Sequence, residues 1–101
     1  MNGGKVFIYG TLRDAAIQRS LFGRVLVGSP DALPGYALAA TRVRGSAFPN
    51  IVPAPGGSVD GEVVAVDAGQ LRRMDRYETD AYSRKQVVTS SGIRAWAYVA
   101  E

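Results

Sequence analysis

The chain has 101 residues, of which 47% are hydrophobic and 21% charged, a composition typical of one globular domain. No apolar run approaches the roughly 20 residues of a membrane-spanning helix, and the first residues lack the basic-then-apolar pattern of a signal peptide. The net charge of +3 is spread along the chain and does not form a basic tract. We therefore expect a single domain over residues 1–101, located in the cytoplasm.

The sequence contains no cysteine and no histidine. Their absence excludes disulfides, thiol nucleophiles, Cys/His zinc sites and catalysis by histidine. An enzyme built from this chain would have to move protons near neutral pH with Asp, Glu, Lys or Tyr, and the group used would need a shifted pKa. A carboxylate on an apolar helix face is therefore the group to look for.

The first predicted element is a strand over Lys5–Tyr9, which breaks at Gly10. A strand that ends at a glycine and leads into a helix leaves free backbone N–H groups, and these can bind an anion. An ordinary strand-to-helix turn is the alternative interpretation. The helix is predicted over Asp14–Phe22, and Gly23 provides a C-terminal stop.

The middle of the chain alternates between strand and turn patterns. Strands are predicted at Arg24–Ser29 and Tyr36–Arg42, on either side of a turn at Pro34–Gly35. The segment Arg44–Ser58 holds three of the five prolines, so we expect a surface loop without a regular strand through Pro49–Pro55. A short extended piece around Ala47–Val52 stays open. Long connections of this kind often carry binding residues.

The last part of the chain predicts a strand, a helix and a hairpin. Asp67 has the character of a helix N-cap, and Gln70 stands three residues later, at the spacing of a capping box. Bulky or apolar residues on both faces of the final strand indicate burial on both sides or closure into a barrel. The predicted ranges are Val59–Val66, with Gly61 as a candidate bulge, Ala68–Tyr77 for the helix, and Tyr82–Thr89 with Ile93–Ala100 for the hairpin.

Glu78 is the candidate carboxylate, at the end of the second predicted helix. Leu71 and Met74 set an inward stripe on this helix, and Glu78, four residues after Met74, falls on the same stripe. A glutamate directed toward a partly dry pocket has a raised pKa, because desolvation disfavours its charged form. Two simpler interpretations are open: Glu78 turns into solvent at the helix end, or it pairs with Arg84.

Three separated segments resemble the gamma-glutamylcyclotransferase-like, or AIG2-like, family. VFIYGTLR at Val6–Arg13 is similar to the family's Tyr-Gly-(Thr/Ser)-Leu substrate loop. Ala47–Val66 is similar to its Pro-containing strand followed by a Gly-Glu strand. LRRMDRYETDAYSRKQVVT with IRAWAYV is similar to its Leu-Asp-x-x-Glu-Gly helix end, Tyr-x-Arg strand and closing strand. The family's glycine after the glutamate is Thr79 here.

The resemblance implies an α+β fold, a small mixed β-barrel flanked by two helices. It implies an enzyme, a transferase or lyase, that uses no metal or cofactor. The α-amino group of a γ-glutamyl amine or peptide attacks the γ-carbonyl, which releases an amine and 5-oxoproline. Carried over residue by residue, the catalytic general acid/base is Glu78, and the substrate-binding residues are Tyr9, Gly10, Thr11, Leu12 and Tyr82.

Two other functions stay open at this point. One is a non-catalytic module of the same fold that binds a small molecule. The other is a basic nucleic-acid-binding barrel, suggested by Arg72, Arg73 and Arg76, although a patch with interleaved aromatics would be typical of that function and a solvated helix face explains these residues equally. We therefore expect a small-molecule γ-glutamyl substrate as the partner, with no nucleic acid and no membrane; the oligomeric state is left open.

Overall fold

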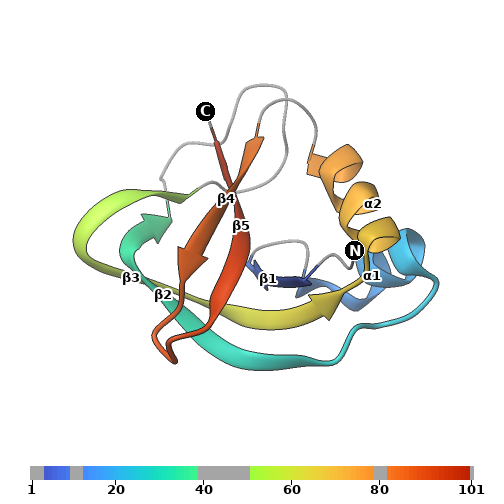
Figure 1. Cartoon of the computed structure of the whole chain (residues 1–101), viewed down its shortest axis with the longest axis horizontal. Coiled ribbons are helices and arrows are strands. Elements are labelled where there is room, and N and C mark those ends of the chain that lie inside the picture. The colour runs from blue at the N-terminus through green and yellow to red at the C-terminus, as the bar shows by residue number, and fades with distance from the viewer. Residues whose placement is uncertain (1–3, 10–12, 39–50, 79–81, 101) are drawn as a thin grey trace.

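A computed structural model describes residues 4–9, 13–38, 51–78 and 82–100 of the chain (Figure 1). Within these ranges the chain forms one mixed sheet and two helices. No helix in this part of the chain is long and apolar enough to cross a membrane. The elements are β1 (Gly4–Ile8), α1 (Ala15–Phe22), β2 (Gly28–Leu38), β3 (Ile51–Val66), α2 (Ala68–Glu78), β4 (Tyr82–Val88) and β5 (Arg94–Ala100).

The five strands follow the order β2-β3-β1-β5-β4. The β1 strand pairs antiparallel with β3 and parallel with β5, so the sheet is mixed. The predicted α+β class is confirmed. The term barrel applies only loosely, because the strands at the two edges of the sheet, β2 and β4, share no ladder within the described residues.

The sheet is strongly curled (Figure 1). Hydrogen bonds connect its two outer strands, β2 and β4. The hydroxyl of Thr89, at the end of β4, donates to a carboxylate oxygen of Asp31 on β2 at 2.7 Å. The N–H of Ser90 donates to the carbonyl of Ala32 at 2.8 Å. These bonds hold the β4–β5 turn against β2 without forming a further ladder.

These contacts predict a pH dependence of stability. The hydroxyl of Thr89, together with N–H groups of Ala32 and Ser91, holds the pKa of Asp31 below its ordinary value of 3.8. A carboxyl whose pKa is lowered by folding adds stability above its unfolded-state pKa, and this stability is lost as the pH falls through the folded-state pKa. We expect Asp31→Asn to unfold at lower temperature than the wild type at pH 6, and the difference to shrink below pH 4. A constant difference across thermal scans from pH 3 to 7 would contradict this assignment.

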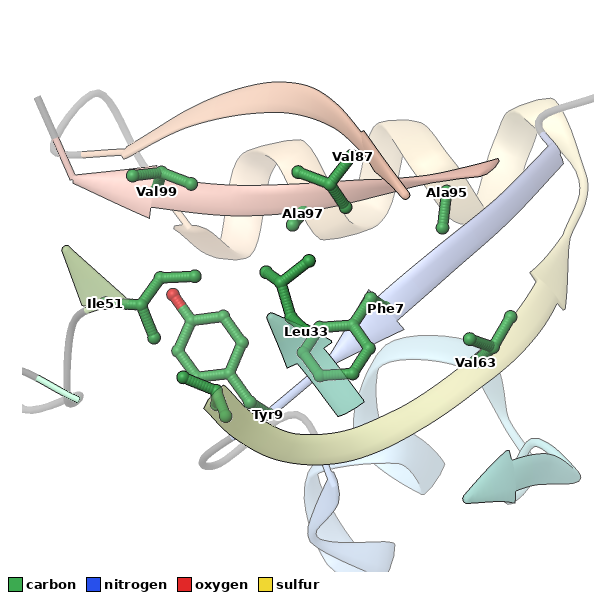
Figure 2. Packing of buried hydrophobic residues seen from close by; sticks show 10 residues of the cluster. Phe7, Tyr9, Leu33, Ile51, Val63, Val87, Ala95, Ala97 and Val99 are labelled. Carbon is green, nitrogen blue, oxygen red and sulfur yellow. The ribbon is translucent and has the colours of Figure 1, made fainter. Parts of the chain in front are cut away.

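The curled sheet has a hydrophobic cluster on each face. Successive residues of a strand point to opposite faces, so Val6 and Ile8 of β1 join one cluster while Phe7 and Tyr9 join the other. The first cluster packs under the helices through Leu71 and Met74, as the inward stripe predicted. The second cluster fills the inside of the curl (Figure 2). The expectation that the last strand is buried on both sides is confirmed, because Ala97 and Tyr98 of β5 belong to opposite clusters.

The second strand differs from its prediction. The β2 strand begins only at Gly28, so Arg24–Val27 is not a strand, and it continues to Leu38. The predicted turn at Pro34–Gly35 is an irregularity inside this strand, where the register with β3 shifts and Gly35 takes a φ of 83°. A local bulge therefore satisfies the turn residues without ending the strand. The rest of the predicted third strand, residues 39–42, lies outside the described residues.

The loop predicted through Pro49–Pro55 is wrong from Ile51 onward, because β3 runs without interruption from Ile51 to Val66. The first part of β3 pairs with β2, for example Pro53 with Tyr36, whereas β1 pairs only with Glu62–Val66. The side of β3 that faces away from β2 is therefore free at its prolines, within the described residues. Pro55 lies between Pro53 and Ser58, where the register with β2 shifts, so its missing N–H interrupts no ladder bond there.

Both helices match their predicted ranges to within one residue: Asp14 is the N-cap of α1 and not its first residue, and α2 ends at Glu78 and not at Tyr77. The carboxylate of Asp14 accepts hydrogen bonds from the N–H groups of Ala16 and Ile17, at 2.8 and 3.3 Å, and Gly23 closes α1 in the left-handed conformation. At α2, the N–H of Gln70 donates to Asp67 at 2.7 Å, and the N–H of Asp67 donates to the amide oxygen of Gln70 at 2.9 Å. The predicted capping box is confirmed.

The capping box is expected to contribute measurably to stability. Asp67→Ala removes the acceptor for one N–H of the first turn and should lower the free energy of unfolding by about 1 kcal/mol. The measurement is urea unfolding monitored by circular dichroism. Asp60→Ala is the control, because Asp60 is an exposed residue of β3, and a change within about 0.5 kcal/mol is expected for it. Equal losses in the two variants would contradict a capping contribution.

Candidate active site

Tyr9 fixes the carboxyl end of β1 to the last strand. Its side chain is buried in the cluster inside the curl, and its hydroxyl donates to the backbone carbonyl of Tyr98. Figure 2 shows the hydroxyl of Tyr9 turned toward β5, with the ring beside Ile51. The point at which the chain leaves β1 for residues 10–12 is therefore fixed relative to β5.

Arg13 marks the point at which the chain returns from residues 10–12. Its guanidinium lies 3.4 Å from a carboxylate oxygen of Glu62 on β3. Glu62 pairs with Ile8 in the β1–β3 ladder. The predicted substrate loop is thus attached to the sheet on both sides, through Tyr9 before it and Arg13 after it. Gly10, Thr11 and Leu12 themselves lie outside the described residues.

Tyr98 connects the sheet to the end of α2. Its side chain is buried on the helix-facing side of β5, and its hydroxyl donates to Asp75 Oδ1 at 2.7 Å. The other oxygen of Asp75 lies 3.5 Å from Arg84 Nη1 on β4. The guanidinium of Arg84 also lies over the ring of Trp96, 4.7 Å from its centre. Residues from α2, β4 and β5 therefore meet one helical turn before the end of α2.

The strand directions bring two of the predicted site residues, Tyr9 and Tyr82, to the same end of the sheet. The β1 and β5 strands are parallel, so their carboxyl ends lie at the same edge, and β4, antiparallel to β5, begins there. Tyr82 opens β4 and pairs with Ala100. Figure 1 shows the start of β4 beside the end of β5, on the side toward which α2 runs. The backbone of Glu78 ends α2, three residues after Asp75.

The backbone positions of Glu78 and Tyr82 are described, whereas their side chains lie outside the description. The sequence left open a pair between Glu78 and Arg84; the described carboxylate partner of Arg84 is Asp75.

Arg72, Arg73 and Arg76 are exposed on α2, as expected for a solvated helix face, and Arg73 donates to the carbonyl of Leu21 at 3.5 Å. No group of acidic side chains suited to a metal ion occurs within the described ranges.

Asp75 and Tyr98 are not among the site residues predicted from the sequence. Their signals were present: Asp75 stands four residues after Leu71, on the inward stripe, and Tyr98 alternates with the small residues of β5. These patterns say which face each side chain takes, but not which partner it meets there. The contact joins residues 23 apart in the chain, and the Tyr9 contact joins residues 89 apart.

The model of one protein family matches residues 6–101, and the family is described as gamma-glutamyl cyclotransferase, AIG2-like. The chain belongs to this family. The match confirms the resemblance based on the three sequence segments. It covers β1 from Val6 onward, the capped helix α2 and the closing hairpin together.

Individual members of the AIG2-like family agree with this assignment. AIG2-like protein C of Arabidopsis thaliana is 30% identical over 83 residues, which are 81% of this chain and 47% of that protein. The chain therefore spans about half the length of the curated relatives it matches. A solution structure of an Arabidopsis thaliana protein superposes with a TM-score of 0.82 at 26% identity, over 96% of this chain and 61% of that one.

A solved gamma-glutamyl cyclotransferase has the same fold. It superposes with a TM-score of 0.77 over 97% of this chain and 66% of that one. Its sequence identity is 18%, so the likeness concerns the fold alone. The family and the mixed α+β architecture thus rest on independent comparisons of sequence and structure.

Proposed function

We propose that this chain, as one domain over residues 1–101, is a γ-glutamylcyclotransferase-type enzyme. Its substrate is a small γ-glutamyl amine or peptide, and its products are an amine and 5-oxoproline. Glu78 acts as the general acid/base, and the backbone N–H groups of Gly10, Thr11 and Leu12 bind the substrate's oxygens. Tyr9 and Tyr82 complete the substrate site.

The proposed reaction needs one carboxylate and a set of hydrogen-bond donors. Glu78 takes a proton from the α-ammonium group, and the free amine attacks the γ-carbonyl carbon. The N–H groups of residues 10–12 stabilise the oxyanion that forms. The C–N bond then breaks, and Glu78 protonates the departing nitrogen. Glu78 moves two of the three ammonium protons in turn: the first protonates the leaving nitrogen, and the second passes from the ring nitrogen to the departing amine, which leaves as its ammonium form. The third proton stays on the lactam nitrogen.

Because the nucleophile and the carbonyl belong to one molecule, holding the γ-glutamyl chain in a folded conformation supplies much of the rate. No thiol and no imidazole takes part, which suits a chain without cysteine or histidine. The reaction also needs no group outside the protein and its substrate.

The observation that carries the proposal is the continuous link from Tyr9 through Tyr98 to Asp75. It joins the end of β1, which leads into residues 10–12, to the last turn of α2, which ends at Glu78. These are the two segments to which the family resemblance assigns the donors and the carboxylate. Family membership supports the reaction class, and the choice of substrate within that class belongs to the proposal.

The test is a panel of γ-glutamyl dipeptides and γ-glutamyl amines, with 5-oxoproline and the released amine measured by mass spectrometry. Equal amounts of the two products are expected. The matched controls are the α-glutamyl isomers, in which the amine is not attached to the γ-carbonyl, and N-acetyl-γ-glutamyl compounds, which lack the nucleophile. Saturable binding without product across the panel would contradict the enzyme assignment and favour a binding module. Binding of oligonucleotides that weakens steeply with salt would favour the nucleic-acid function.

A further inference from the structure

The carboxylate of Asp75 is held by two different strands. Its Oδ1 accepts from the hydroxyl of Tyr98 on β5 at 2.7 Å, and its Oδ2 lies 3.5 Å from Arg84 Nη1 on β4. Arg84 and Tyr98 are themselves partners in the β4–β5 ladder. The contacts of Asp75 therefore restrain α2 against this hairpin, both along the helix axis and in rotation about it.

Arg84 is oriented by its surroundings more than by a hydrogen bond to Asp75. Its guanidinium lies over Trp96, and its Nη1 is buried without a hydrogen-bond partner in the described residues. At 3.5 Å the contact with Asp75 is longer than a good N–H···O bond and acts mainly through charge. The well-formed hydrogen bond on Asp75 comes from Tyr98, so Tyr98 sets the position and Arg84 adds attraction.

We propose that Asp75 is a positioning residue that holds Glu78 in place for the reaction, through Tyr98 and Arg84. This inference rests on the proposed function. Three residues of helix rise about 4.5 Å, so Glu78 stands one turn beyond Asp75 on the same side of α2. The last turn of a helix lacks partners for its carbonyl groups and frays easily. The contacts of Asp75 with Tyr98 and Arg84, which we call the tether, lie one turn before the end and limit this fraying.

The size of the effects separates positioning from a purely structural role. The side chains of Asp75 and Arg84 are 41% and 29% exposed, and ion pairs of this kind contribute little to global stability. A displacement of about 1 Å at a catalytic group, in contrast, lowers the rate about 100-fold. Loss of the tether should therefore change kcat much more than the melting temperature.

The test compares Asp75→Asn, Asp75→Ala and Tyr98→Phe with the wild type. Asp75→Asn removes the attraction to Arg84 and keeps an acceptor for the hydroxyl, whereas Tyr98→Phe removes only the hydrogen bond. We expect kcat to fall about tenfold in each of these two variants and about 100-fold in Asp75→Ala. KM should stay within about twofold.

Arg76→Gln is the matched control, because Arg76 is an exposed residue on the same turn of α2. It should retain wild-type kcat and KM. Arg84→Lys, which keeps the charge, should retain more of kcat than Arg84→Gln. An unchanged kcat in all Asp75 and Tyr98 variants would overturn the proposal, and so would a loss confined to KM or one that follows a loss of folded protein.

Hydrogen exchange separates this proposal from the proposed function. The amides of residues 75–78 should exchange faster in Asp75→Ala and Tyr98→Phe, with the amides of β1 and β5 unchanged. Unchanged exchange at the end of α2 would overturn the tether itself. Wild-type turnover in Glu78→Gln, or no turnover of any substrate, would instead overturn the proposed function and the positioning role with it, even where exchange is faster.

Discussion

Glu78→Gln is expected to abolish 5-oxoproline release while leaving the fold intact. The amide has nearly the shape of the carboxylate, but it cannot accept the proton of the α-ammonium group or return one to the leaving amine. General acid/base catalysis contributes about 10²–10⁴ to the rate, and we expect kcat to fall by at least about 10³ because one group serves both transfers. The measurement is single-substrate turnover with product quantified by mass spectrometry.

A second carboxylate variant separates the role of Glu78 from a general effect of charge. Asp60→Asn makes the same change in net charge at an exposed position on β3, and turnover should remain that of the wild type. The melting temperatures of both variants should stay close to that of the wild type. Undiminished turnover in Glu78→Gln would exclude the proposed mechanism, whichever substrate is used.

Gly61→Ala is expected to have the largest effect on stability. A Cβ at this position would lie 2.3 Å from the carbonyl oxygen of Ile8 and 2.7 Å from Cζ of Phe7. Neither group can withdraw freely, because the first is backbone in a ladder and the second is fully buried. Overpacking a core lowers the free energy of unfolding by about 1–3 kcal/mol. Because the new Cβ would contact backbone, we expect a loss near the upper end, about 3 kcal/mol.

The measurement is urea unfolding, and Gly69→Ala provides the matched control. Gly69 lies in the first turn of α2, where alanine is the better helix former, and its Cβ would meet only side-chain atoms, a carboxylate oxygen of Asp67 at 3.3 Å and Nη2 of Arg72 at 4.0 Å. We expect this variant to keep or slightly raise the stability of the wild type. Equal stability of the two variants would mean that β1 and β3 can separate at Gly61 without cost.

Gly61 also illustrates what a sequence pattern leaves undecided. A glycine inside a strand indicates either a bulge or a close approach of another backbone. The bulge expected from the sequence is wrong, because Gly61 pairs with Asp31 in regular register. The second meaning holds here: the glycine leaves room for the end of β1, one residue before Tyr9. Only the tertiary structure, which places the end of β1 against Gly61 of β3, distinguishes a bulge from a close approach.

The local signals of the sequence were sufficient for several elements and for the family. The strand β1, both helices with their caps, and the closing hairpin follow from patterns within about ten residues, because their hydrogen bonds are local. The extent of β2 and β3 does not follow from local patterns. Pro53 and Pro55 argue against a strand on their own. The β3 strand nevertheless passes through them, because Pro53 is paired on one side only and Pro55 lies where the register with β2 shifts.

By itself, the sequence determined the family, the α+β class and the identity of one candidate carboxylate in a chain without histidine or cysteine. The tertiary structure decided which residues meet. Tyr9, Tyr98 and Asp75 come together only because β1 lies parallel to β5 and α2 packs over the hairpin. The physical reason is that periodicity assigns a side chain to a face, whereas its partner depends on strand order and register, which are set by contacts between distant segments.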